Sequence, residues 1–255
     1  MNMLRKIVIP VFGVLAVLAF QGCTAASGGD ARATSPGVAA GGPMTSDAPR
    51  SLAPYFTPVS SPTQAPDPDG FLRRWLLLDP INKPNRTNTG FTETYIRSTF
   101  HAEYFPDQFT VVPRDGDKVT VAGEELAWHA LDSATWNVKV FRFAYGLNKR
   151  HYGVLFWAVT VVDSPRQMQN VRLAVGSNSA SMWWLNGQEA VTLFGDRRMV
   201  MDDGVSRRLT LNKGPNVLRG AVINGPGLSD FCVRFIDEQG NPIRDLTLSL
   251  DNAGR

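Results

Sequence analysis

The chain contains little cysteine and little histidine. Its 255 residues include two cysteines and three histidines, so at most one internal disulfide can form and a disulfide-stapled scaffold is excluded. The histidines, His101, His129 and His151, do not stand in a His-x-His or His-x-x-x-His spacing. We therefore predict no metal site of the zinc-hydrolase type.

The chain also lacks the Gly-x-Ser-x-Gly motif that places a catalytic serine on a strand-to-helix turn. A glycosidase needs only two carboxylates, and Glu124 and Glu125 beside Trp128 form one such pair. Two solvated charges in a loop explain that pair more simply. We predict a protein that is not an enzyme, with a carbohydrate-active hydrolase as the less favoured alternative.

Strong net charge is absent as well. The formal net charge is +3, and loss of residues 1–22 would remove Arg5 and Lys6 and leave 3 − 2 = +1. No run of basic residues is present to follow a phosphate backbone, so nucleic acid is not an expected partner.

The N-terminus carries a targeting pattern. Arg5 and Lys6 precede an apolar run over residues 7–20, which is too short to span a bilayer and suits a signal peptide. Gly22 directly before Cys23 resembles the bacterial lipoprotein signal. That resemblance implies a signal peptide over residues 1–22, lipidation of Cys23 with palmitate among the acyl chains, and a membrane anchor. An ordinary secretory signal with an incidental cysteine is the alternative.

Thr24 follows the cysteine, with no aspartate at that position. In a Gram-negative host, this pattern resembles that of lipoproteins sorted to the outer membrane. We therefore expect the protein in the bacterial cell envelope.

Residues 23–69 read as a tether. Eight of the 17 prolines lie in this segment, and glycine, alanine, serine and threonine fill most of the rest. Such a segment buries too little apolar surface to offset the entropy lost on ordering. We predict a disordered linker between the lipidated cysteine and a folded domain over residues 70–255.

The folded domain reads as a series of short strands with glycine, proline and asparagine between them. Residues 92–96 are expected to open a short helix. The expected strands are 71–78, 118–121, 138–145, 153–162, 171–176, 205–211, 216–223, 231–236 and 243–250. This punctuation, with almost no helical periodicity, predicts an all-β fold, a jelly-roll β-sandwich.

Asn186-Gly187 lies between two runs rich in aromatic and β-branched residues. This dipeptide favours the type I′ turn of a β-hairpin, because both central residues need positive φ. Trp183 and Trp184 then point to opposite faces of one strand. One of them can enter a core, and the other needs a second buried surface, a partner or a ligand.

Four segments resemble galactose-binding-like jelly-roll modules of the carbohydrate-binding type. The segments are Arg74 to Pro80, Trp184 to Gln188, Leu209 to Asn216, and Phe231 to Ile243. Asp79 and Ile81 stand where the family has glycine and phenylalanine. The resemblance covers roughly residues 70–250 and implies a jelly-roll fold. Many such modules accompany glycoside hydrolases and carbohydrate esterases, which implies a polysaccharide or glycan as ligand.

Sugar sites combine flat aromatic rings with polar groups. The ligand-binding candidates of this kind are Trp128, His129, Asp132 and Trp136, in sequence that reads as a loop, and Trp184 with Gln188 on the hairpin. Core packing is the alternative for each tryptophan.

No cofactor is expected. The pairs Asp115/Asp117 and Asp202/Asp203 offer oxygen ligands to Ca²⁺, with ordinary surface turns as the simpler reading. Cys232 lies in a strand-like alternation and is expected to be a small buried hydrophobe. The sequence thus predicts a non-catalytic lipoprotein that binds carbohydrate or another envelope component. A structural or protein-interaction domain of an envelope assembly is the alternative.

Overall fold

The structure, a computed structural model, describes residues 50–251 apart from residue 86. The predicted signal peptide, Cys23 and most of the predicted tether lie outside these residues. None of the helices within the described part is long and apolar enough to cross a membrane.

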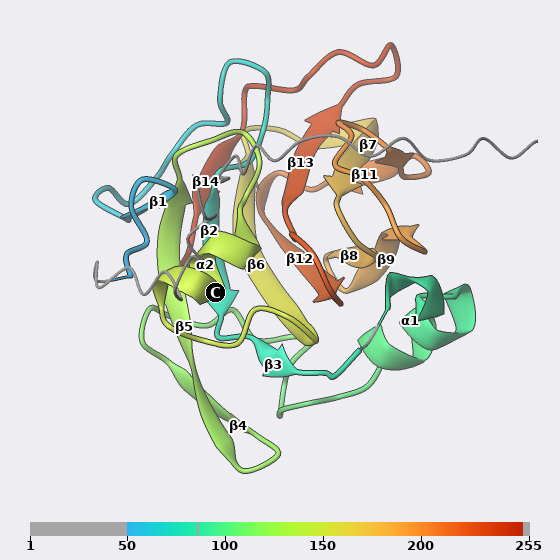
Figure 1. The fold of residues 1–255 in the computed structure, drawn as a ribbon. Coiled ribbons are helices and arrows are strands. Elements are labelled where there is room, and N and C mark those ends of the chain that lie inside the picture. Colours follow the sequence, from blue (N-terminus) through green and yellow to red (C-terminus); the bar gives the residue numbers. More distant parts are fainter. Residues whose placement is uncertain (1–49, 86, 252–255) are drawn as a thin grey trace, which may run out of the picture. The chain divides into compact units, whose positions relative to one another are not determined.

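A large antiparallel sheet forms the body of the molecule (Figure 1). Its strand order is β1-β5-β2-β6-β12-β8-β9, with β3 and β14 also paired to β6 and β4 paired to β5. The strands are β1 (Phe56–Pro58), β2 (Arg74–Leu78), β3 (Ile81–Asn82), β4 (Lys118–Val121), β5 (Glu124–Ser133), β6 (Val154–Ser164), β8 (Ser181–Leu185), β9 (Gln188–Leu193), β12 (Gly214–Asn224) and β14 (Thr247–Ser249).

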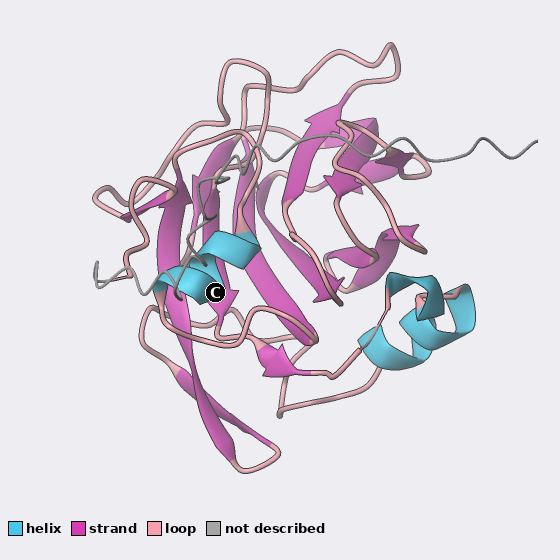
Figure 2. Cartoon of the chain, viewed as in Figure 1, coloured by secondary structure: helices cyan, strands magenta, loops and turns pink. Residues whose placement is uncertain are grey.

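A smaller antiparallel sheet packs against one face of the large one. Its central strand β7 pairs with three neighbours, and its members are β7 (Met168–Ser177), β10 (Gly204–Val205), β11 (Leu209–Leu211) and β13 (Phe231–Ile236). The predicted all-β sandwich of two antiparallel sheets is therefore confirmed. Helical turns are few: η1 (Asn88–Gly90), α1 (Glu93–Phe100) and α2 (Val140–Gly146), which Figure 2 shows as short cyan segments beside the strands.

Both faces of the large sheet are buried. In β2, Trp75 and Leu77 enter the core between the two sheets, whereas Leu76 and Leu78 enter a second core on the opposite face. Helix α1 contributes to that second core, which makes it a third layer over the sheet. This is why β2 and β6 read as nearly continuous apolar runs instead of alternating ones.

The hairpin β8–β9 has the predicted turn. Asn186 has φ 51° and Gly187 has φ 78°, as the positive-φ positions of a type I′ turn require. Trp183 lies in the core between the sheets, and Trp184 lies in the second core. Both tryptophans are therefore structural.

Strand β5 was not predicted, because its segment, rich in glutamate, alanine and polar residues, has weak β propensity. Pairing with β1 and β2 on its two sides overrides that preference.

Residues 138–145, predicted as a strand, keep only a bridge from Val138 to Phe231, and α2 begins at Val140. Their apolar positions fit both periods, and the buried set Val140, Phe141, Phe143 and Ala144 follows the helical one. The predicted opening of a helix at residues 92–96 is confirmed by α1, whose N-cap is Thr92.

The folded unit begins earlier than residue 70. Residues 50–69, predicted to be tether, contain β1, which pairs with β5 and buries Phe56. Gln64 forms a bridge with Leu248, and Ser61 accepts a hydrogen bond from the buried Arg74 (2.8 Å). The proline-rich composition of this segment is typical of a tether. The segment is nevertheless folded, because it pairs with strands that are distant in the sequence.

Candidate functional site

Two predicted ligand-binding tryptophans are core residues. Trp128 lies on β5 with 2% of its surface exposed, and Trp184 retains 4%. Trp184 stacks on Trp157 with ring centroids 5.5 Å apart, and Trp128 packs edge-on against Phe105. The prediction that they form a sugar platform is wrong, because sheet pairing turns both rings into the second core.

Two predicted polar site residues hold the structure together. Asp132 forms a two-pronged ion pair with Arg74, with both N–O distances 2.9 Å. His129 lies 3.1 Å from Asp79, which also pairs with Lys149 at 3.1 Å. Since each acid is half-buried or buried, these contacts supply the charge compensation that burial demands.

The carboxylate of Asp79 is a buried anion with three donors. Burial opposes its ionisation, but the hydrogen bonds from His129, the Ala127 amide and Lys149 outweigh that effect and hold the pKa of Asp79 below its usual value. Within the described part of the chain, the His129 ring has no hydrogen bond besides this one. Among the described residues, His129 therefore makes no hydrogen bond to a serine or cysteine.

Trp136 and Gln188, the remaining predicted residues, are accessible but have different neighbours in the fold. Trp136 is half-buried against Phe71 at 5.4 Å between rings. Gln188 is exposed at the β8–β9 turn and lines a groove of about 510 Å³. The structure therefore does not bring the six candidates into one site.

Other aromatic side chains do gather at one place on the surface. Phe141 and Tyr145 of α2 meet His151 and Tyr152 of the following loop, and we call these four residues the aromatic surface. Centroid distances are 4.8 Å for Phe141–His151, 4.6 Å for His151–Tyr152 and 5.8 Å for Tyr145–His151. Tyr152 is 50% exposed, so the group reaches the solvent at this residue.

The loop over residues 147–153 is held in place at several points. The Lys149 amide donates to the Ala144 carbonyl (2.8 Å), and its ammonium group pairs with Asp79. Asn224 donates to the carbonyl of His151 (2.6 Å). Because both ends are fixed to the helix and to the sheet, the rings of the aromatic surface are positioned before any ligand arrives.

Polar groups border the aromatic surface. A hollow of about 520 Å³ is lined by Arg50, Gly146, Leu147 and Asn148. The Arg50 guanidinium lies 4.6 Å from the Tyr145 ring centroid and donates to Asn148 (2.5 Å). Flat rings beside hydrogen-bond donors and acceptors can hold the apolar face and the hydroxyl rim of a sugar.

The aromatic surface was missed because residues 138–145 were read as a strand, which sends alternate side chains to opposite faces. With the helical period, Phe141 and Tyr145 are four residues apart and share a face, and their rings are indeed nearly parallel, at 7°. A helical reading of that segment would have placed both rings on one face of the helix, whereas their contact with His151 depends on the path of the following loop.

The acids proposed for Ca²⁺ have protein partners. Asp202 pairs with Arg234, and Asp203 with Arg197 at 2.9 Å. Asp115 and Asp117 accept backbone amides at 2.8 and 2.7 Å. Over residues 50–251, leaving out 86, no three metal-ligating side chains gather.

Cys232 is buried, as predicted, with 1% of its surface exposed. Burial raises the pKa of its thiol to about 12. A thiol with that pKa is protonated at neutral pH and is not a nucleophile.

Comparison with known proteins finds no matching family model and no matching curated protein. Among solved structures, a PA14 sugar-binding domain from an RTX adhesin aligns with TM-score 0.39 and 10% identity, over 69% of this chain and 96% of the other. The PA14 domain of the MpAFP antifreeze protein gives 0.38 and 9%, over 68% and 89%.

A β-glucosidase from Kluyveromyces marxianus gives TM-score 0.31 and 16% identity, over 67% of this chain and 15% of the enzyme. At these scores the similarities decide neither topology nor ligand. What this chain binds has to be argued from its own surface.

Proposed function

We propose that this chain is a non-catalytic carbohydrate-binding protein of the bacterial envelope and that the aromatic surface is its sugar site. The observation that carries the proposal is the exposed ring of Tyr152, which continues a packed group of three further rings. The four segments that resemble galactose-binding-like modules support the same ligand class, and each of them contains strand residues of the sandwich.

The test is a glycan array followed by calorimetry on the best ligand, with Tyr152→Ala as the diagnostic variant. Loss of one stacking ring removes roughly 0.5–1.5 kcal/mol, so binding should weaken roughly two- to tenfold. Met201→Ala is the matched control, because Met201 is an exposed apolar side chain, 47% accessible, outside the aromatic surface. Equal binding by both variants would remove the sugar site from this surface.

A structural or protein-interaction role is the second candidate, and one observation favours it. Leu228 is 58% exposed, and the neighbouring Ser229 carbonyl accepts the Phe141 amide (3.0 Å), so the backbone next to an exposed apolar residue contacts the helix of the aromatic surface. Exposed apolar patches also serve protein contacts. Co-purification of a fixed protein partner that depends on Leu228 and Tyr152, without glycan binding, would favour this candidate.

We also propose that Cys23 is lipidated and that the protein reaches the outer membrane if the host is Gram-negative. The support is the pattern of basic residues, apolar run and Gly22-Cys23 in the sequence. Labelling with a palmitate analogue should mark the wild-type chain and leave Cys23→Ser unmarked. A Cys23→Ser chain that stays in the membrane fraction would contradict the anchor.

A further inference from the structure

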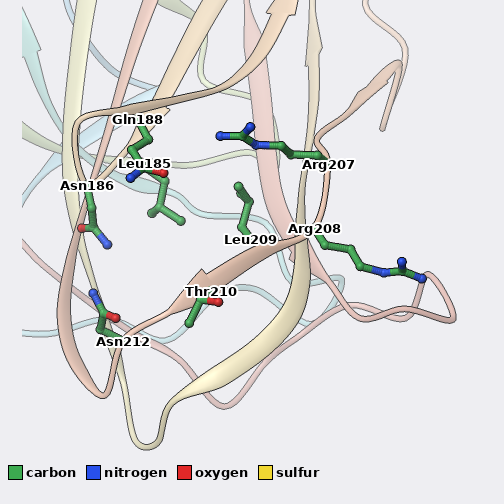
Figure 3. A pocket seen from close by; sticks show the side chains of 8 residues that line it. All are labelled: Leu185, Asn186, Gln188, Arg207, Arg208, Leu209, Thr210 and Asn212. Atoms are coloured by element: carbon green, nitrogen blue, oxygen red, sulfur yellow. The ribbon is translucent and has the colours of Figure 1, made fainter.

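A second surface feature lies at the turn of the β8–β9 hairpin. It is a groove of about 510 Å³ between this turn and the segment that leads into β12 (Figure 3). The lining residues are Leu185, Asn186, Gln188, Arg207, Arg208, Leu209, Thr210 and Asn212. Two of the lining residues are apolar and six are polar.

The walls of the groove are fixed by Asn216, which is fully buried. Its side chain accepts from Asn186 (2.9 Å) and from the Asn212 amide (2.9 Å). It also donates to the Asn212 carbonyl (2.9 Å). One buried amide thus ties the hairpin turn to the opposite wall, which keeps the spacing of the groove constant.

Four polar side chains of the groove make no polar contact with the described residues. Within residues 50–251, the side chains of Gln188, Arg207, Thr210 and Asn212 have no hydrogen bond or ion pair, whereas Arg208 pairs with Glu238 at 3.0 Å. Figure 3 shows Arg207 reaching across the groove towards Gln188 and Arg208 pointing away from it. The guanidinium of Arg207 is therefore available to a ligand.

The charge of the groove has one sign. None of its lining residues is acidic, so nothing within the lining compensates Arg207. A guanidinium binds carboxylate and sulfate oxygens through paired N–H donors. The adjoining amides and hydroxyl are suited to the neutral hydroxyl groups of a sugar.

The groove is distinct from the aromatic surface. Asn216 stands near the start of β12, whereas Asn224, which holds the loop of the aromatic surface, is its last residue. The two asparagines are eight residues apart on this strand, which is about 26 Å. A single small ligand cannot occupy both places.

We propose that this groove binds an acidic saccharide, with Arg207 holding the anionic group of a uronic acid or sulfated sugar. Gln188, Thr210 and Asn212 contact neighbouring hydroxyls. The saccharide part of this inference rests on the proposed function, whereas the anion part rests on the groove alone.

Affinity electrophoresis and calorimetry on the full chain test the proposal with three polymers. Polygalacturonate supplies carboxylates, dextran sulfate supplies sulfates, and unmodified dextran is neutral. At least one acidic polymer should bind, and the difference between the two identifies the anion. Arg207→Gln should weaken that binding at least tenfold, and Gln188→Ala a few-fold.

Arg114→Gln is the matched control, because it removes the same charge from an exposed arginine outside the groove. It should bind acidic polymer as the wild type does, and all variants should keep the wild-type Tm. Equal losses in Arg207→Gln and Arg114→Gln would mean general charge attraction and overturn the proposal. Failure of both acidic polymers to bind the wild type would also overturn it.

The two proposals can fail separately. If Tyr152→Ala weakens binding of a neutral glycan while acidic polymers never bind, the aromatic surface stands and the groove is refuted. If acidic binding depends on Arg207 while no glycan binds in a way that depends on Tyr152, the groove stands and the aromatic surface loses its role.

Discussion

At the scale of single residues, Gly220 shows how an absent side chain makes room for the core. It lies opposite Trp183 in the β8–β12 pairing, and a Cβ at this position would approach the Trp183 ring to 2.3 Å. The ring also packs against Trp75 and Phe231, at 5.9 and 5.0 Å between centroids. The Trp183 ring therefore cannot shift away from a Cβ added at position 220.

Gly220→Ala should lower the free energy of unfolding by about 1–3 kcal/mol through overpacking. Urea titration followed by tryptophan fluorescence measures the change. Gly90→Ala is the control, since nothing lies within 4 Å of a Cβ there, and it should be near neutral. A Gly220→Ala protein as stable as Gly90→Ala would show that Trp183 can move.

Ionisation of Asp79 makes the stability of the fold depend on pH. Its pKa is held below the usual 3.8, so its charged form stabilises the fold above that pH. The stabilisation is lost as pH falls below about 3.8 towards the lower folded-state value.

Asp79→Asn should therefore flatten this acid limb of the stability curve and cost about 1–3 kcal/mol at pH 7. Unfolding curves between pH 2 and pH 7, measured for wild type and variant, check both effects. Parallel curves for the two proteins would contradict the role given to Asp79.

At the scale of elements, the position of β1 shows where the folded domain begins. It covers the edge of β5, and Ser61 after it satisfies the buried Arg74. An uncovered edge strand invites pairing with other chains. The segment over residues 50–69 is therefore part of the sandwich.

A chain starting at residue 70 should lose several kcal/mol of unfolding free energy, since truncating a buried phenylalanine such as Phe56 alone costs about 3–5 kcal/mol. It should also aggregate through β5. A chain starting at residue 50 should melt like the full-length protein. Thermal unfolding and light scattering on both chains measure these effects. Equal Tm values for the two chains would mean that the folded domain begins at residue 70.

At the scale of the whole molecule, the sandwich carries two candidate sites at the two ends of β12. Only a long polymer can reach both, and a second contact on the same polymer acts at high effective concentration.

For a long acidic polysaccharide that also binds the aromatic surface, Tyr152→Ala with Arg207→Gln should therefore lose more affinity than Arg207→Gln alone. For a short acidic oligosaccharide, the double variant should match Arg207→Gln. Calorimetry with both ligand lengths measures this. A double variant no weaker on the polymer would mean that the sites act independently.

Local chemistry in the sequence was enough to predict the elements whose signals are short-range. The Asn186-Gly187 turn follows from the need for positive φ, and β4 and β13 appear with the predicted bounds because alternation and turn residues mark them. Cys232 was also placed correctly, since a cysteine among strand hydrophobes is normally buried.

Only the tertiary structure determined which side chains are exposed and which of them lie together on the surface. Whether Trp128 faces solvent depends on the pairing of β5 with β2, and Arg50 reaches Tyr145 only because distant segments pack together. The groove likewise requires the hairpin turn and the segment before β12 to meet at Asn216. Contacts between residues far apart in the chain leave no periodic pattern in sequence, so the sandwich was predictable and the candidate sites were not.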